Sequence, residues 1–362
     1  MKKHYLIYLF AVLLIGCRQQ ELKESKIIDF GEITDIKLSE TISEYHIIQL
    51  ETTDESLFGN LDMLNIIGNE IYVLDTDTNS GVYVFSKEGI FLRKLDNRGR
   101  GPGEFIVASS FAFDKNDNIY ILDNAVGKVM TYDIKSFEYK RDVQLPNTGG
   151  YPYSFSVSDD GEYFYYYSSI NLNNPERRQN FMVADIMGKI INRDVSVPSN
   201  SYIYGTQQLF YKFDNDLFGY PIFSNKVYRF DKGDISEQYI FNFGQNKFPD
   251  QEFFYKNNSS TMYSELIKEK YIKSMTVVES STHILVRYDI AERKYWGIYD
   301  KRDESTKSVR VDNIEGSLGP INKLSYCLTV DNDWFVISCI LRSDANSLTE
   351  SENTSLMFFK LK

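Results

Sequence analysis

The sequence predicts an all-β fold: a six-bladed β-propeller closed by its N-terminal strand, with a small helical insertion between blades four and five. Three observations predict it. Six segments repeat a pattern of turn-forming residues followed by a β-rich run. Aromatic residues are abundant, with 27 Tyr and 25 Phe in 362 residues, and such residues favour pleated, half-buried surfaces. The last repeat lacks a strand that the start of the chain can supply.

The spacing of the six segments is typical of propeller blades. Each segment corresponds to the second strand of a hairpin, and further strands follow it. A four-stranded unit that repeats every ~40–50 residues indicates a blade. The long fourth interval contains residues 249–270, whose pattern suits a capped amphipathic helix. The equivalent second-strand positions are Ile71, Ile119, Tyr163, Leu217, Ile284 and Phe335, at intervals of 48, 44, 54, 67 and 51 residues.

The two ends of the chain complete each other in this arrangement. The sixth repeat ends after its third strand, at Lys362, while the run from Tyr45 to Leu50 alternates and precedes the first blade. Pairing these segments would close the ring and remove two exposed sheet edges. We therefore assign residues 41–362 to the propeller.

The N-terminus has the pattern of an export signal. Lys2 and Lys3 precede an apolar run from Tyr5 to Ile15, which is short for a membrane span but suits a signal-peptide core. The run ends in Leu14-Ile15-Gly16-Cys17, which resembles the lipobox of bacterial lipoproteins. This resemblance implies a signal peptide over 1–16, lipidation at Cys17 and a tether over 17–40. The alternative is an ordinary cleaved signal, or a short anchor with a chance cysteine.

The net charge of the mature chain limits the classes of partner that we expect. Without Lys2 and Lys3 the chain keeps 38 basic and 51 acidic side chains, a net charge of −13. Such a body repels phosphate backbones, so we expect no nucleic-acid partner. The expected membrane contact is the N-terminal lipid, which places the protein in the cell envelope, on either the periplasmic or the cell-surface side.

A family resemblance rests on three features: the start at Cys17, the strand motif Ile71-Tyr72-Val73-Leu74-Asp75, and the stretch Arg98-Gly99-Arg100-Gly101-Pro102-Gly103-Glu104-Phe105. In these the sequence resembles bacterial six-bladed β-propeller lipoproteins related to NHL-repeat proteins. The resemblance implies the fold and covers nearly the whole mature chain. It implies little about function, because one fold hosts many functions.

The predicted ligand site lies on the face where one blade continues into the next. Arginines can donate to an anionic group, and Tyr-rich rims suit glycans or peptides. The alternative for the glycine-rich stretch is a structural turn in which Glu104 bonds backbone donors. The other residues are equally consistent with ordinary solvated loops. The candidate ligand-binding residues are Arg98, Arg100, Glu104, Tyr151, Tyr153, Arg177 and Arg178.

The sequence offers little for catalysis or cofactors. Only His46 and His283 remain in the mature chain, and a zinc site would require several convergent ligands. The run from Asp75 to Gly81 imitates a calcium loop, but Ser86 stands where a bidentate Glu is needed. We therefore expect no metal and no cofactor. The predicted function is a binding or scaffold module for a glycan, peptide or envelope protein; the alternative is a hydrolase or lyase that uses loop carboxylates at the central channel.

Two cysteines flank the predicted hairpin turn at residues 330–333. Cys327 and Cys339 would lie nearly opposite each other, and an oxidising envelope would permit a disulfide bond. Two buried free thiols are the alternative, and the sequence favours it because direct cross-strand bridges are strained.

Overall fold

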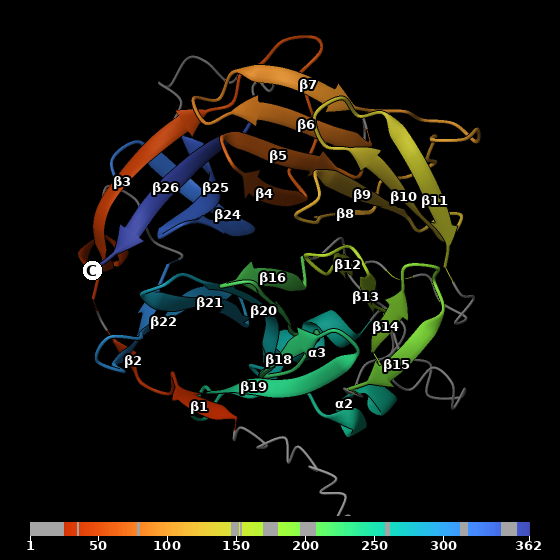
Figure 1. The fold of residues 1–362 in the computed structure, drawn as a ribbon. Helices are drawn as coiled ribbons and strands as arrows, with labels where there is room; N and C mark the ends of the chain where they lie inside the picture. The colour runs from red at the N-terminus through yellow and green to blue at the C-terminus, as the bar shows by residue number, and fades with distance from the viewer. Residues whose placement is uncertain are drawn as a thin grey trace, which may run out of the picture.

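A computed structural model of the protein describes residues 25–34, 36–77, 80–145, 152, 154–168, 180–195, 208–257, 261–311, 318–341 and 353–362, without the side chains of 325–327. These residues form six sheets arranged around a central axis (Figure 1). The predicted six-bladed propeller is confirmed.

Each blade contains an antiparallel meander of four strands, the first of which is nearest the axis, and in blades 4 and 5 one further strand lies outside the fourth. Blade 1 contains β4 (Met63–Ile67), β5 (Glu70–Asp75), β6 (Gly81–Ser86) and β7 (Phe91–Leu95). Blade 2 contains β8 (Ser110–Phe113), β9 (Asn118–Asp123), β10 (Lys128–Asp133) and β11 (Tyr139–Gln144). Blade 3 contains β12 (Ser154–Val157), β13 (Tyr163–Tyr167), β14 (Phe181–Asp185) and β15 (Ile190–Asp194).

The remaining blades follow the same plan. Blade 4 contains β16 (Phe210–Phe213), β17 (Asp216–Gly219), β18 (Lys226–Asp231) and β19 (Asp234–Asn242). Blade 5 contains β20 (Ile272–Glu279), β21 (His283–Ile290), β22 (Arg293–Asp300) and β23 (Thr306–Arg310). Blade 6 contains β24 (Ile321–Asp331), β25 (Trp334–Leu341), β26 (Ser355–Leu361) and β3 (Ile42–Gln49).

The ring closes as the sequence predicts. Strand β3 pairs antiparallel with β26, with Ile47 opposite Met357. A short helix, α1 (Leu38–Thr41), precedes β3, and the backbone N–H of Lys362 donates to the carbonyl of Thr41 over 3.0 Å. The two ends of the propeller therefore share one sheet.

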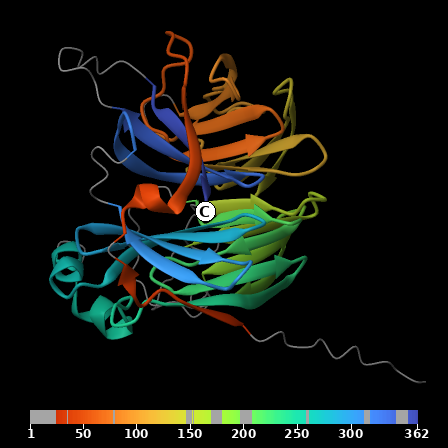
Figure 2. The same cartoon turned by 90° about the vertical axis from the view of Figure 1, so that its left-hand side faces the viewer.

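The N-terminal segment is more structured than the sequence predicts. Strand β1 (Lys26–Asp29) pairs parallel with β19, and β2 (Ile33–Thr34) pairs parallel with β23. Figures 1 and 2 show this segment along the outer edge of the ring. Part of the range 17–40, assigned to the tether, thus belongs to the folded body. The physical reason is burial: Ile28 and Phe30 alternate with exposed neighbours, and each is 2% exposed.

The second strand of each blade is packed between two neighbouring blades, which explains its apolar sequence. In β5, Ile71 and Val73 face the core shared with blade 6, whereas Tyr72 and Leu74 face the core shared with blade 2. Both faces are therefore buried, and the strand is an unbroken hydrophobic run instead of an alternating one.

The aspartates that end two of these strands hold the loops around them. Asp75 accepts from the backbone N–H of Gly59 over 2.8 Å and from that of Asp77 over 2.9 Å. Asp123 makes the equivalent bonds with Ile106 and Ala125, over 2.6 and 2.9 Å. Each carboxylate thus ties a blade's own turn to the connection from the preceding blade, which gives Asp75 a structural role.

The predicted helical insertion between blades four and five is present. It consists of α2 (Gln251–Lys256) and α3 (Met262–Lys268). The Asp250 carboxylate caps α2 by accepting from the backbone N–H of Phe253 over 2.9 Å. Residues such as Phe254 and Leu266 form a small separate core with Phe223 of blade 4.

We name the two faces of the ring by their connections. The turn face carries the turns between first and second strands and between third and fourth strands, such as residues 114–117 and 134–138. The junction face carries the turns between second and third strands and the connections between blades, such as residues 96–109. No helix among the described residues has the length and hydrophobicity that crossing a membrane requires.

Candidate functional site

The glycine-rich stretch predicted to bind a ligand forms a self-contained turn at the outer edge of the ring. The Glu104 carboxylate accepts from the backbone N–H of Gly101 over 2.8 Å. Gly103 has φ +72° and packs against Tyr139 of β11, the outermost strand of blade 2, while the Tyr132 hydroxyl donates to its carbonyl over 3.2 Å. This geometry matches the structural alternative for Glu104.

Three of the predicted ligand-binding residues are described, and the structure places them away from the axis. Arg98, Arg100 and Glu104 are exposed on this peripheral turn, and none of them lines the central cavity. The other predicted site residues, and the predicted lipidation site, lie outside the described residues: Tyr151, Tyr153, Arg177, Arg178 and Cys17.

The two histidines lie in different blades and away from the axis. His46, on the edge strand β3, stacks on Phe358, with ring centroids 4.9 Å apart. His283 is buried at the start of β21, where Nε2 lies 3.1 Å from the Lys362 carbonyl, and burial lowers its pKa. In the described part of the chain, no group of three or more His, Cys, Asp or Glu could hold a metal ion.

Cys339 is a free, buried thiol whose strand partner is Leu324. The register shifts between Leu324 and Leu328, in the region that includes Cys327. The side chain of Cys327 is outside the described set, so the proposed bridge has only one described partner.

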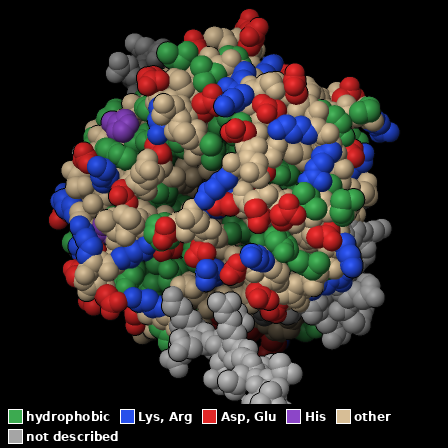
Figure 3. Space-filling model, viewed as in Figure 1, with side chains coloured by type: hydrophobic (Ala, Val, Ile, Leu, Met, Phe, Trp, Pro, Cys, Tyr) green, Lys and Arg blue, Asp and Glu red, His purple; other side chains and the backbone are tan. Residues whose placement is uncertain are grey.

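A cavity with a volume of about 620 Å³ lies on the axis of the ring. Its walls come from the innermost strands of all six blades, β4, β8, β12, β16, β20 and β24. Because Lys115, Asp159 and Lys212 of the wall belong to the turn-face ends of their strands, the charged part of the cavity lies toward the turn face. Figure 3 shows the molecule hollowed near the centre of the ring.

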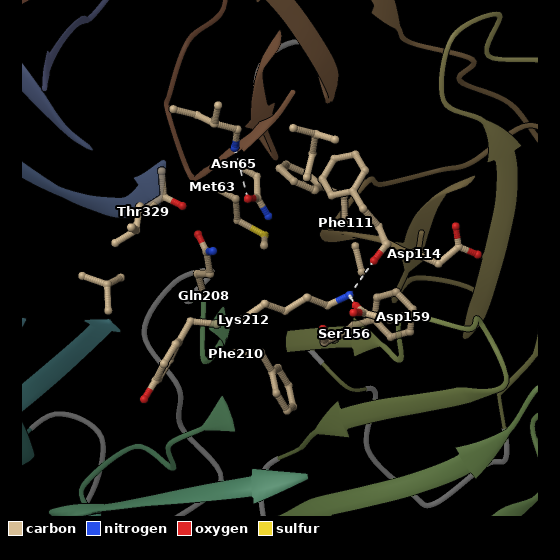
Figure 4. A pocket seen from close by; sticks show the side chains of 18 of the residues that line it. Met63, Asn65, Phe111, Asp114, Ser156, Asp159, Gln208, Phe210, Lys212 and Thr329 are labelled. Atoms are coloured by element: carbon tan, nitrogen blue, oxygen red, sulfur yellow. Dashed lines mark hydrogen bonds and ion pairs between the residues drawn. The ribbon is translucent and has the colours of Figure 1, made fainter. Parts of the chain in front are cut away.

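One ion-paired cluster in the wall joins blades 2, 3 and 4. Lys115 and Lys212 contact the two different carboxylate oxygens of Asp159, each over 2.7 Å. Lys212 also donates to the Phe113 carbonyl over 2.9 Å, and Figure 4 shows its side chain reaching toward Asp159. Burial alone raises the pKa of Asp159, but the bonds from both lysines outweigh it, and the net pKa lies below its ordinary value.

A second cluster surrounds Glu279, at the end of β20. This side chain is 3% exposed and accepts from the hydroxyls of Tyr211 and Tyr239, over 3.2 and 3.0 Å. The Lys301 ammonium lies 2.7 Å from the same carboxylate. Burial, together with the charge of Glu279, holds the pKa of Tyr211 well above its usual range.

Asp114 is likewise engaged by its own blade. Its carboxylate accepts from the Tyr120 hydroxyl over 2.8 Å and from the Asn118 amide over 2.7 Å. Three of the four acids that line the cavity, Asp114, Asp159 and Glu279, are therefore held by cations or by hydroxyl and amide donors of the protein.

A neutral polar group of the cavity wall lacks a hydrogen-bond partner within the protein. The Gln208 Oε1 atom is buried and has no hydrogen-bond partner. Asn65 lies on the wall opposite, on β4 (Figure 4). Each innermost strand is also the terminal strand of its sheet, so one edge of its backbone faces the axis instead of a neighbouring strand. Such groups need hydrogen-bond partners from water or from a ligand.

The sequence did not predict this cavity, because the prediction considered mainly the arginines, tyrosines and glycines of the loops. The first strands of the blades are short, as in β12 and β16, and carry no motif. The available signal was the position of a polar residue within or beside each first strand, such as Asn65, Asp159 or Gln208. Assigning that signal required the first strands to be identified and placed around the axis.

Comparisons with known proteins agree with the fold. A family model described as "6-bladed beta-propeller" (DUF5128) matches residues 17–338. A crystal structure of a "Putative exported protein" from Bacteroides fragilis is 26% identical, with a TM-score of 0.80, and the match covers 93% of this chain and 100% of that one. A DUF4221-family structure from Bacteroides vulgatus is 11% identical, with a TM-score of 0.56 and coverage of 89% and 97%. That likeness shows the fold alone. No curated protein matches the chain. The chain belongs to the 6-bladed beta-propeller family DUF5128.

Proposed function

We propose that this protein is an exported, lipid-anchored binding module of the cell envelope, and that its axial cavity holds the ligand. The N-terminal pattern that ends at Cys17 supports export and lipidation. The similarity to a Bacteroides protein described as exported supports the same location. Lipidation is tested by fatty-acid labelling, which the wild type should accept and a Cys17→Ser variant should not.

The proposal of a binding site rests on a difference between the charged and the neutral groups of the cavity: the charged groups have partners within the protein, and one neutral acceptor has none. Asp159 is paired with Lys115 and Lys212, whereas Gln208 Oε1 is buried without a partner. An unsatisfied buried acceptor costs about 1–3 kcal/mol. A folded protein retains such a cost where a functional contact offsets it.

The ligand that suits these groups is small, neutral and rich in hydroxyl or amide groups. A charged ligand would have to displace an ion pair from a partly buried site, which is costly. A neutral sugar unit of a glycan would instead donate to Gln208 and to the exposed backbone edges, and pack on wall residues such as Phe111 and Phe210. The volume of about 620 Å³ lies in the range of small-molecule sites.

Catalysis by loop carboxylates is the alternative, and the charge arrangement disfavours it. A general acid needs a raised pKa, whereas the pKa of Asp159 is lowered by two lysines that occupy both of its oxygens. Glu279 is held by two tyrosines and Lys301. Both carboxylates are therefore engaged by groups of the protein itself.

Titration calorimetry with matched sugars tests the binding proposal. We expect N-acetylglucosamine, which is neutral, to bind more tightly than the charged sugars glucuronate and glucosamine, with an affinity that changes little with salt. Gln208→Leu should weaken this binding while leaving the protein as stable as the wild type or more stable, since it removes an unsatisfied acceptor.

Gln251→Leu is the matched control, because Gln251 Nε2 is also buried without a partner but lies on α2, outside the cavity. It should leave binding unchanged. Tighter, salt-dependent binding of a charged sugar would refute the neutral class but keep the site. If none of the three sugars binds, the sugar proposal is refuted.

A further inference from the structure

We propose that the N-terminal tether holds the turn face, and with it the charged end of the axial cavity, toward the lipid bilayer. This inference rests on the proposed lipidation at Cys17. It adds a surface, an orientation and a direction of ligand entry that lipidation alone does not specify.

The first described residues lie at the turn-face side of blades 4 and 5. The Ser25 hydroxyl donates to Glu237 Oε1 of β19 over 2.7 Å. The Lys26 ammonium lies 2.6 Å from Glu304 Oε1, in the turn that joins β22 to β23. Because this turn belongs to the turn face, the Lys26 side chain extends from β1 toward that face.

The direction of β1 supports the same orientation. Strand β1 runs parallel to β19, with Lys26 opposite Tyr239 and Asp29 opposite Asn242. Strand β19 begins at the turn after β18 and runs toward the junction face. The N-terminal end of β1 therefore points toward the turn face, where the tether joins it.

The length of the tether allows it to reach either face. The eight residues from Cys17 to Ser25 span at most about 26–29 Å when fully extended. Strand β19 has nine residues, and such a strand is about 30 Å long. Lys26 lies opposite Tyr239, the sixth of these nine residues, so the tether begins partway between the two faces, and the orientation rests on the direction of β1 and on the contact of Lys26 with Glu304.

Exposed acids argue against insertion of this face into the bilayer. Asp117, Asp160 and Asp214 are exposed on the turns of blades 2, 3 and 4. Lys115, Lys232 and Arg302 are exposed on the same face, and a charge of either sign is costly to move into the hydrocarbon of a bilayer. The turn face therefore stands close to the bilayer without entering it, and a ligand reaches the cavity from the space between the ring and the membrane.

Fluorescence quenching in vesicles tests the orientation. Lipidated protein with Cys327→Ser is labelled at one introduced cysteine, either Glu162→Cys on the turn face or Ala125→Cys on the junction face; both positions are exposed. The vesicles contain phosphatidylcholine with a nitroxide on the headgroup. We expect the label at position 162 to lose most of its fluorescence and the label at position 125 to keep it.

A lengthened tether is the internal control. Inserting about twenty Gly and Ser residues after Glu24 adds roughly 25 Å of flexible reach, which should remove the difference between the two labels. With the natural tether, equal quenching of the two labels would indicate that the ring stands edge-on to the bilayer. Stronger quenching of the label at position 125 would indicate that the junction face lies toward the bilayer. Either result overturns the inference. Flotation with the vesicles separates the two proposals, because protein that does not float refutes the lipid anchor itself.

Discussion

Substitution of Gly103 tests whether the glycine-rich turn is structural. Gly103 has φ +72°, and a Cβ placed on it would lie 2.8 Å from both Cβ and Cγ of Tyr139. Because Cβ of Tyr139 is fixed to the backbone of β11, a change of rotamer would move the ring but would leave the contact with Cβ. A left-handed conformation costs a non-glycine residue about 1–2 kcal/mol, and overpacking costs about 1–3 kcal/mol more. We therefore expect Gly103→Ala to lose about 2–5 kcal/mol of unfolding free energy.

Gly68 provides the matched control for this prediction. It has φ +60°, but no atom lies within 4 Å of an added Cβ. Gly68→Ala should lose only the conformational cost, about 1 kcal/mol. Urea unfolding followed by tryptophan fluorescence measures both variants, with the slope checked for a change in cooperativity. If Gly103→Ala is no less stable than Gly68→Ala, the turn is not packed as described.

Further predictions concern charge, burial and exposure. Asp159→Asn should lower the unfolding free energy by about 1 kcal/mol at neutral pH. Because the pKa of Asp159 is depressed in the folded protein, this difference in unfolding free energy should be fully present above the unfolded pKa of about 4. It should vanish as the pH falls through the folded pKa. A difference that does not depend on pH would contradict the ion pairs. Burial raises the pKa of Cys339 to about 12, so alkylation with peptide mapping should leave this thiol unmodified until denaturant is added. Phe30→Ala should lower the unfolding free energy by about 3–4 kcal/mol, since the ring of Phe30 packs on that of Phe241 with 5.6 Å between the ring centroids. An unchanged urea midpoint would mean that β1 is not part of the core. Arg98→Ala with Arg100→Ala should change stability by less than about 0.5 kcal/mol, because both side chains are exposed.

The repeat could be predicted because its signal is local. Each second strand is buried on both faces and begins after a turn, so positions such as Ile71 and Ile119 stand out as apolar runs after Asn or Asp. The turns themselves are readable: Asp117 and Asn332 adopt φ of 57° and 54°, a conformation that Asp and Asn tolerate better than most residues. Closure by the strand near Ile47 followed from the strand that the last blade lacks.

The candidate site and the N-terminal strands could not be predicted in the same way. The wall of the cavity brings together Asn65, Asp159 and Gln208 from three blades, and only the closed ring makes them neighbours. Whether an acid such as Asp159 is free or paired depends on Lys115 and Lys212, which are 44 residues before it and 53 residues after it in the sequence. Strand β1 is short and stabilised by its contacts with β19, so its own propensity indicates little.

The most direct test of the proposed binding site is a crystal structure of the protein soaked with N-acetylglucosamine. We expect the sugar in the axial cavity, with a hydroxyl or amide donating to Gln208 Oε1 and the pairs of Asp159 with Lys115 and Lys212 intact. A sugar bound at the junction face, or a cavity that holds only water at saturating sugar, would contradict the proposal.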